Sequence, residues 1–159
     1  MENIIYLDHA ATTKVDDVVL KEMLPYLSYN YGNASSLYSI GKVSKSAVER
    51  ARMQVANAIG CNSEEIYFTS CGSESDNLAI KGIAKANKRY GKHIITSSIE
   101  HPAVLETCKT LEQEGFEVSY VPVLENGIID INALKKLIRK DTILISIMTA
   151  NNEVGTIQP

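Results

Sequence analysis

The stretch Phe68-Thr69-Ser70-Cys71-Gly72-Ser73-Glu74-Ser75-Asp76-Asn77-Leu78-Ala79 joins an apolar strand pattern to the start of a helix. A helix start leaves backbone N–H groups unpaired and carries the positive end of the macrodipole, so it is a ready site for a phosphate. Gly72 permits a tight turn and the close approach of a ligand, and Ser73 adds a hydroxyl donor. Joints of this kind are also common as purely structural turns, so this segment alone leaves both interpretations open.

Apolar residues recur at helical spacing in several other segments of the chain. Start and stop signals for helices, such as a proline at the first helical position or a glycine after the last, flank several of them. The first predicted helix follows Asp16 and is kinked or ended by Pro25, and the second covers residues 47–59 with Gly60 as its cap. The next two are the stretch from Leu78 to Ala84 and residues 102–111, with His101 as N-cap and Gly115 ending the helix. The last is opened by Asp130 and has Arg139 and Lys140 in its last turn.

Strand patterns alternate with these helices. They lie at 66–69, 93–97, 117–123 and 143–148, and the last is expected to be buried. Because several strands are apolar on both faces, the alternation predicts an α/β fold in three layers, with a largely parallel sheet flanked by helices.

Polar segments follow three of these strands. They are Gly72-Ser73, Ser98–His101 and Ala150–Glu153. Ligands of parallel sheets bind beyond the carboxyl ends of the strands, so we expect the three segments to meet at one edge of the sheet. A phosphate-binding turn, an imidazole and a carboxamide at one edge would suit a small anionic aromatic cofactor.

Each of these residues also has a simpler interpretation. His101 reads equally as a helix cap or as a buried histidine with satisfied hydrogen bonds. Asn152 reads as a turn residue before Gly155. Glu74 lies beside the proposed phosphate and would repel it unless its side chain points away. The residues alone therefore predict a phosphate-bearing ligand at the edge of an α/β sheet.

Composition limits the other classes of function. The chain has 159 residues, 45% of them apolar, and a net charge of −3, which suits one compact domain and argues against a nucleic-acid-binding surface. Cys61, Cys71 and Cys108 are odd in number and far apart, so they match neither a disulfide framework nor a metal site. The N-terminus has no basic region followed by a long apolar run, so we expect no signal peptide and no membrane span, and the cysteine pattern favours a reducing cytoplasm.

Motifs in the same order resemble those of the cysteine desulfurases, class V members of the pyridoxal-phosphate aminotransferase-like enzymes. The motifs are Tyr6–Thr13, Tyr31–Leu37, Glu74–Gly82, Glu100–Val104 and Ala150–Pro159. The last is similar to the iron–sulfur-cluster and nitrogen-fixation branch. The chain departs from the family pattern at Ala34, where proline is usual, at Tyr38, where histidine is frequent, and at Cys71-Gly72-Ser73, where many relatives have Gly-Ala-Thr.

The resemblance implies a role for each site residue. Gly72 and Ser73 would hold the phosphate of pyridoxal 5'-phosphate, because the departure at this turn keeps a small residue followed by a hydroxyl. His101 would stack on the pyridine ring and move protons as the catalytic residue. Asn152 would hydrogen-bond near the phenolic oxygen of the ring and the substrate carboxylate.

The resemblance also implies an activity and partners. The family is a group of transferases that convert L-cysteine to L-alanine and an enzyme persulfide, which supplies sulfur for iron–sulfur clusters or thiolated cofactors. It implies a homodimer that works with sulfur-acceptor or iron–sulfur scaffold proteins. It does not choose between cysteine and selenocysteine as substrate, so a selenocysteine lyase parent remains an alternative.

Two catalytic groups of the family have no counterpart in these residues. The lysine that carries the cofactor directly follows a histidine in the family, whereas His9, His93 and His101 precede alanine, isoleucine and proline. No cysteine of the chain matches the mobile loop of the sulfur-accepting cysteine. We therefore expect the chain by itself to be inactive.

The chain thus resembles the first two-fifths or so of a desulfurase. Residues 1–15 would be the N-terminal segment of the small domain, and residues 16–159 an incomplete large, pyridoxal-phosphate-binding domain of the fold-type I enzymes. The alternative is a noncatalytic binding or assembly module that retains the fold.

Overall fold

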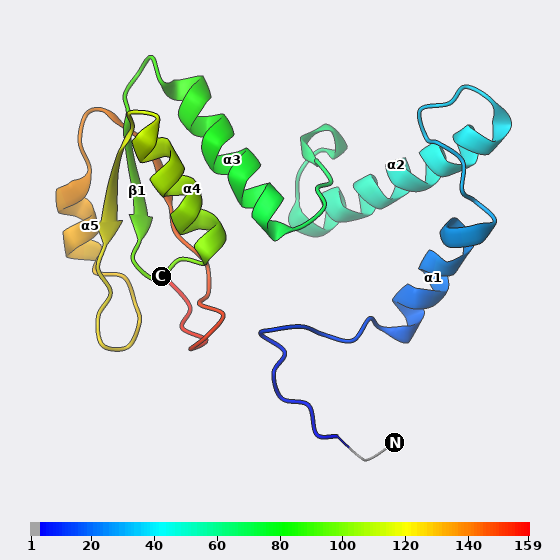
Figure 1. Ribbon diagram of the computed structural model, residues 1–159, viewed down its shortest axis with the longest axis horizontal. Coiled ribbons are helices and arrows are strands. Elements are labelled where there is room, and N and C mark those ends of the chain that lie inside the picture. Colours follow the sequence, from blue (N-terminus) through cyan, green and yellow to red (C-terminus); the bar gives the residue numbers. More distant parts are fainter. Residues whose placement is uncertain (1–3) are drawn as a thin grey trace. The chain divides into compact units, whose positions relative to one another are not determined.

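The computed structural model describes residues 4–159, which form two compact units separated between Phe68 and Thr69. Unit 1 contains α1 (Asp17–Ser28), α2 (Ser39–Ile59) and the short 3₁₀ helix η1 (Ser63–Glu65) (Figure 1). Unit 2 contains α3 (Gly72–Asn87), β1 (His93–Ser97), α4 (Pro102–Gln113), β2 (Glu117–Val121), α5 (Ile131–Leu137) and β3 (Thr142–Ser146). None of the helices in residues 4–159 is long and apolar enough to cross a bilayer.

Two ends of the helices in unit 1 lie at signals in the sequence, the start of α1 and the end of α2, whereas α2 begins at Ser39, before the predicted residue 47. The Asp16 carboxylate accepts a hydrogen bond of 2.8 Å from the Val18 N–H and so caps α1. That helix ends three residues after Pro25, and α2 ends at Gly60, whose φ of 74° is the left-handed conformation that glycine adopts readily. The predicted end of α2 at Gly60 is confirmed, whereas α1 does not end at Pro25 but continues through it to Ser28.

The predicted strand at 66–69 is wrong. These residues follow η1 as an extended segment, and no strand of residues 4–159 pairs with it. A strand exists only through hydrogen bonds to a neighbour, and an apolar run cannot show by itself whether that neighbour is present.

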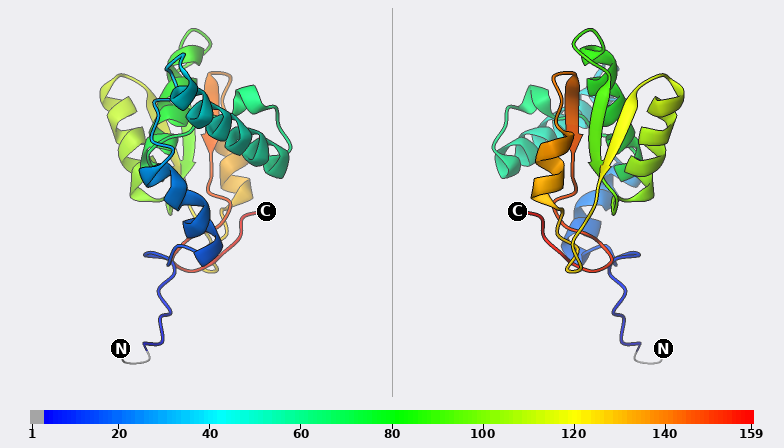
Figure 2. Two further views of the ribbon diagram at one scale, coloured as in Figure 1. Left: turned by 90° about the vertical axis from the view of Figure 1, so that its right-hand side faces the viewer. Right: turned by 90° about the vertical axis from the view of Figure 1, so that its left-hand side faces the viewer.

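The strands of unit 2 form one parallel sheet in the order β2-β1-β3. The strands lie side by side in the right-hand view of Figure 2, with α5 in front of them. Ile94 of the central strand packs with side chains of α3 and α4, whereas Ile95 packs with Val121, Ile129 and partly buried residues of α5. Helices therefore cover both faces of the sheet, and the predicted three-layer α/β fold is confirmed.

Two expectations in this unit need correction. The strand predicted to be buried is β3, which is half-buried with Ile145 42% exposed, because it pairs with β1 alone and lies at the open edge of the sheet. The helix that Asp130 opens ends at Leu137, so neither Arg139 nor Lys140 is in its last turn. The Arg139 guanidinium instead forms ion pairs with Glu117 at 2.7 Å and Asp141 at 2.8 Å.

Candidate functional site

His101 opens α4 at the carboxyl end of the central strand. Its Nδ1 accepts a hydrogen bond of 3.1 Å from the Ala103 N–H, and Pro102 occupies the first turn, so the side chain is the N-cap of the helix. Because Nδ1 accepts, the neutral ring carries its proton on Nε2, which has no hydrogen-bond partner in the described part of the chain. The residue is exposed, which leaves the outer nitrogen and the ring face open to a ligand.

Asn152 lies in the turn that follows β3, but its neighbour makes that turn. The Asn151 side-chain oxygen accepts from the Glu153 N–H at 2.9 Å and the Val154 N–H at 3.0 Å, and Asn151 is buried. The Asn152 side chain is exposed and donates to the Glu153 carboxylate at 3.0 Å. The simpler interpretation, a turn-forming asparagine, therefore applies to Asn151, while the Asn152 carboxamide makes only the exposed hydrogen bond to Glu153 within the described residues.

Hydrogen bonds join the loop that carries His101 to the loop that carries Asn152. The Met148 N–H donates to the Glu100 carboxylate at 2.8 Å, and the Asn151 side-chain nitrogen donates to the Ile99 carbonyl at 3.1 Å. Both donors follow β3 and both acceptors follow β1. The structure thus brings the segments of His101 and Asn152 together at one edge of the sheet.

The start of α3 presents N–H donors that have no oxygen partner in the described chain, although those of Ser73 and Glu74 are directed at the Cys71 sulfur. None of the N–H groups of Gly72, Ser73 and Glu74 donates to an oxygen within residues 4–159, and neither does the exposed Ser73 hydroxyl. A Cβ at Gly72 would meet no atom within 4 Å, so the turn is open on that side. Three backbone donors and a hydroxyl at a helix start are the donor set that a phosphate group needs.

The Glu74 carboxylate is turned back toward the chain that precedes α3. It accepts hydrogen bonds of 2.6 Å from both the hydroxyl and the N–H of Ser70. These bonds, that of the Ser70 hydroxyl first, hold the pKa of the Glu74 carboxyl below its ordinary value, so it is ionised at neutral pH. The carboxylate leaves the N–H groups of the first turn open, but its charge opposes an anion bound beside it.

The same backbone donors interact with the thiol next to this turn. The N–H of Glu74 and the Ser70 hydroxyl, followed by the N–H of Ser73, lower the pKa of the exposed Cys71 thiol. A thiolate and a phosphate are both anions, so the start of α3 has an electrostatic preference for negative charge.

The helices α3 and α4 begin at the same end of unit 2. They pack side by side, and the Lys85 ammonium contacts the Glu114 carboxylate at 3.2 Å near their carboxyl ends. Their amino ends therefore lie at the opposite end, which is also the end where β1 finishes (Figure 1). Ser73 and His101 each open one of these two neighbouring helices.

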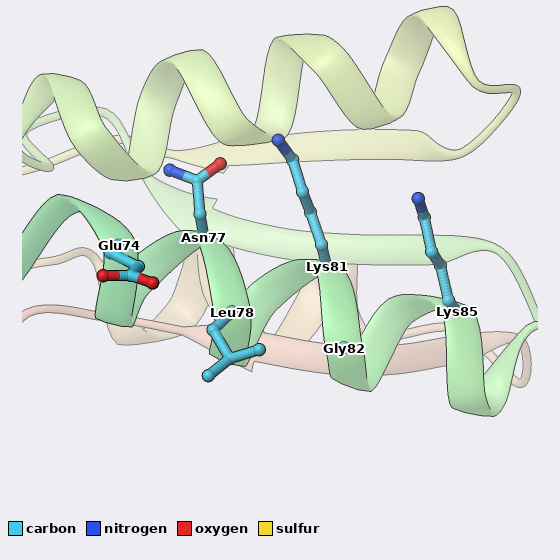
Figure 3. A pocket seen from close by; sticks show the side chains of 6 residues that line it. All are labelled: Glu74, Asn77, Leu78, Lys81, Gly82 and Lys85. Atoms are coloured by element: carbon cyan, nitrogen blue, oxygen red, sulfur yellow. The ribbon is translucent and has the colours of Figure 1, made fainter. Parts of the chain in front are cut away.

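Two depressions in unit 2 lie outside the predicted site residues. One, of about 360 Å³, runs along the outer side of α3 (Figure 3) and is lined by Glu74, Asn77, Leu78, Lys81, Gly82 and Lys85. The other, of about 540 Å³, lies beside Asn151, between the segments 123–127 and 151–156. No cluster of histidine, cysteine and acidic residues suited to a metal ion occurs within residues 4–159.

The sequence pattern of the family described as aminotransferase class-V matches residues 5–159. The chain belongs to the class-V aminotransferase family. Members of this family, including the cysteine desulfurases, depend on pyridoxal phosphate.

Relatives within the class-V family are named cysteine desulfurases. The chain is 60% identical over 155 residues to the cysteine desulfurase IscS of Methanosarcina thermophila, covering 98% of this chain and 38% of that protein. It is 54% identical over 159 residues to the cysteine desulfurase IscS of Dictyoglomus turgidum, covering 100% of this chain and 40% of that protein. The chain thus spans about two-fifths of the length of these relatives.

Solved structures share its fold. A NifS-like protein matches with a TM-score of 0.94 and 48% identity over 98% of this chain and 43% of its own. SspA, solved in complex with cysteine, matches with a TM-score of 0.91 and 42% identity over 97% of this chain and 44% of its own.

The residues present suit a phosphorylated aromatic cofactor of the kind that class-V enzymes use. The N–H donors at the start of α3, which have no oxygen partner in the described chain, match a phosphate, and the exposed His101 ring offers a flat face to an aromatic ring. The sequence patterns did not indicate Glu100 or Asn151, the buried residues that join the two loops. Their signal was weak, because a glutamate before a helix cap and the first of two asparagines are both ordinary loop residues.

Proposed function

We propose that this chain is the N-terminal, cofactor-binding part of a cysteine desulfurase. The observation that carries the proposal is the pair of hydrogen bonds that joins the His101 and Asn152 loops at the carboxyl edge of the sheet. The identity of 54–60% to named cysteine desulfurases supports the assignment of the reaction class. The reaction of the whole protein would convert L-cysteine to L-alanine and an enzyme persulfide.

Each site residue has a task in this proposal. The N–H groups of Gly72 and Ser73, with the Ser73 hydroxyl, bind the phosphate of pyridoxal 5'-phosphate. The His101 ring covers the pyridine ring, and its Nε2 holds or moves a proton there. The Asn152 carboxamide donates to the phenolic oxygen of the ring and orients the substrate carboxylate. When bound, pyridoxal phosphate supplies an electron sink for breaking the bond between Cβ and sulfur.

Other parts of the proposal concern the whole protein. The sequence contains no histidine followed by lysine, so the covalent attachment of the cofactor would require residues outside these 159. We propose a homodimer that takes L-cysteine in the cytoplasm and passes sulfur to acceptor or iron–sulfur scaffold proteins. Residues 1–15 would belong to the small domain and 16–159 to the large one, although residues 1–3 lie outside the described chain.

The binding step can be tested with pyridoxamine 5'-phosphate, which has the same ring and phosphate but no aldehyde to react with surface lysines. We expect it to shift the backbone NMR signals of Ser73, His101 and Asn152 with one common dissociation constant. Ser73→Ala and His101→Asn should each weaken binding, because the first removes a phosphate donor and the second removes the ring but keeps a good helix cap. Ser46→Ala, at an exposed serine of α2, is the matched control and should leave binding unchanged.

NMR signal shifts confined to one of the three residues would contradict this site. Equal binding by Ser73→Ala and Ser46→Ala would also contradict it. The reaction itself is tested by alanine formation from L-cysteine. The purified 159-residue chain with pyridoxal phosphate should release none, and turnover free of any contaminating desulfurase would show that the proposed need for further residues is wrong.

A further inference from the structure

We propose that Glu100 is a positioning residue for this site: its buried carboxylate holds the His101 loop and the Asn152 loop at a fixed separation. The inference rests on the proposed function, because it concerns the geometry of the same cofactor site. It assigns a role to a residue that would not itself touch the cofactor.

Glu100 is 6% exposed and lies between the last residue of β1 and the cap of α4. One of its oxygens, Oε1, accepts from the Ser97 hydroxyl at 2.6 Å and from the Met148 N–H at 2.8 Å. A buried carboxylate is costly unless such donors satisfy it, so its position is closely tied to both donors. Ser97 belongs to β1 and Met148 follows β3, and the carboxylate therefore connects two neighbouring strands beyond their ends.

The sheet itself does not reach this point. The last backbone pair between the two strands is Thr96 with Ser146, and the Thr96 hydroxyl adds one bond of 2.9 Å to the Ser146 carbonyl. Beyond that pair the chains separate into loops, and the bonds made by Glu100 and by the Asn151 side chain continue the connection. His101 directly follows one of these anchors and Asn152 the other, so a change in the connection changes the spacing of the two ligand-facing groups.

The role depends on accepting hydrogen bonds, and variants can separate this from charge. Glu100→Gln keeps an oxygen that can accept from both donors, removes the charge, and places an NH₂ group where the second oxygen was. Glu100→Ala removes the acceptor and leaves the Met148 N–H and the Ser97 hydroxyl without their partner. Ser97→Ala removes one donor and leaves the bond to Met148 in place.

Two probes distinguish the loops from the phosphate turn. Pyridoxamine 5'-phosphate requires all three segments, whereas inorganic phosphate requires only the start of α3. For the 159-residue chain we expect Glu100→Ala to weaken pyridoxamine 5'-phosphate by roughly tenfold, a loss typical of one or two hydrogen bonds, and to leave the inorganic phosphate constant within about twofold. Glu100→Gln should rescue binding to within about twofold of the unmodified chain.

The NMR shifts give a second readout that overall destabilisation would not produce. In Glu100→Ala the ligand should still shift Ser73, while the shifts of His101 and Asn152 should shrink and lose their common dissociation constant. If Glu100→Ala does not fold, Ser97→Ala carries the test, with an expected loss of a few-fold for pyridoxamine 5'-phosphate alone.

The positioning role is overturned, and the proposed function stands, if a folded Glu100→Ala binds pyridoxamine 5'-phosphate as tightly as the unmodified chain does. Where Glu100→Ala does not fold, the same result for Ser97→Ala overturns it. A parallel loss for both probes would also overturn it, because it would indicate general destabilisation. If the unmodified chain binds pyridoxamine 5'-phosphate at none of the three segments, the proposed function fails, and this inference fails with it.

Discussion

His93 ties the three strands of unit 2 together at the end of the sheet opposite the site. It is 1% exposed at the start of β1, with Nδ1 2.7 Å from the Thr142 hydroxyl on β3 and Nε2 2.9 Å from the Ser119 hydroxyl on β2. The Arg139 N–H donates to the Thr142 oxygen at 2.8 Å, so we assign the Thr142 proton to His93 Nδ1 and the ring proton to Nε2. In this assignment the ring is neutral and only Nε2 carries a proton.

Protonation of this ring should destabilise unit 2. Burial, and then the positive charge of Arg139, lower the pKa of His93 below its ordinary value of 6.5, while Asp141 and Glu117 act in the opposite direction. A histidine whose pKa is lowered by folding binds its proton more readily when unfolded. The stabilisation that neutral His93 gives the folded state is therefore fully present above pH 6.5 and is lost as the pH falls below that value.

The size of the effect is bounded by one proton. The free energy of unfolding can fall by at most about 1.4 kcal/mol for each pH unit below 6.5 through this residue, so the loss by pH 5.5 is at most about that amount. The loss stops once the pH is below the pKa of the folded state.

Urea unfolding followed by far-UV circular dichroism between pH 7.5 and 5.0 measures this dependence. We expect His93→Gln to remove the part of the pH dependence that comes from His93. The free energy of unfolding of this variant should therefore fall less steeply below pH 6.5 than that of the unmodified chain. Ser119→Ala is the matched control: it removes one hydrogen bond but keeps the titrating ring, so it should lower stability and keep the pH dependence. Curves for His93→Gln and the unmodified chain that run parallel from pH 7.5 to 5.0 would refute the reasoning.

Two further predictions concern glycines and thiols. A Cβ at Gly91 would lie 2.1 Å from the Asp141 carbonyl oxygen, so Gly91→Ala should lower the melting temperature. Gly82 is in an open helical position, so Gly82→Ala should stabilise the chain by up to about 1 kcal/mol. Equal melting temperatures of the two variants would contradict this prediction. Burial raises the pKa of the fully buried Cys108 thiol to about 11, whereas Cys71 is exposed and its pKa is lowered. Iodoacetamide at pH 7.5 should therefore label Cys71 first and Cys108 only after unfolding, which mass spectrometry can follow. Similar labelling rates of the two thiols in the folded chain would contradict this prediction.

The parts of the fold that could be predicted are those with local causes. Asp16 and Asp130 accept from N–H groups within three residues of themselves, and Gly60 adopts its left-handed conformation where the apolar spacing stops. The segment 66–69 and the burial of β3 depend on which strands lie alongside, which is a non-local property. An apolar run has the same composition whether it is paired, unpaired or at an edge.

The same distinction applies to the site. The rule that parallel strands present their carboxyl ends at one edge was enough to predict that the segments of His101 and Asn152 meet there, whereas the roles of the two residues came from the family resemblance. It could not select Glu100, because the need for a buried acceptor arises only when the Met148 N–H and the Ser97 hydroxyl come together from separate strands. Residues that hold a site in place are therefore harder to find from sequence than the residues that face its ligand.

The two ends of the central strand have separate tasks, and this gives a control for the binding experiments. At its start, His93 bonds to Thr142, and just beyond its other end Glu100 bonds to Met148, so side chains connect β1 to β3 at both ends. A variant at the first end should lower stability without changing the spacing of the loops at the second. His93→Gln should therefore bind pyridoxamine 5'-phosphate as the unmodified chain does at pH 7.5, where it remains folded. If His93→Gln loses affinity to the same degree as Glu100→Ala, binding reports the stability of the whole sheet, and the separate role of the Glu100 carboxylate is lost.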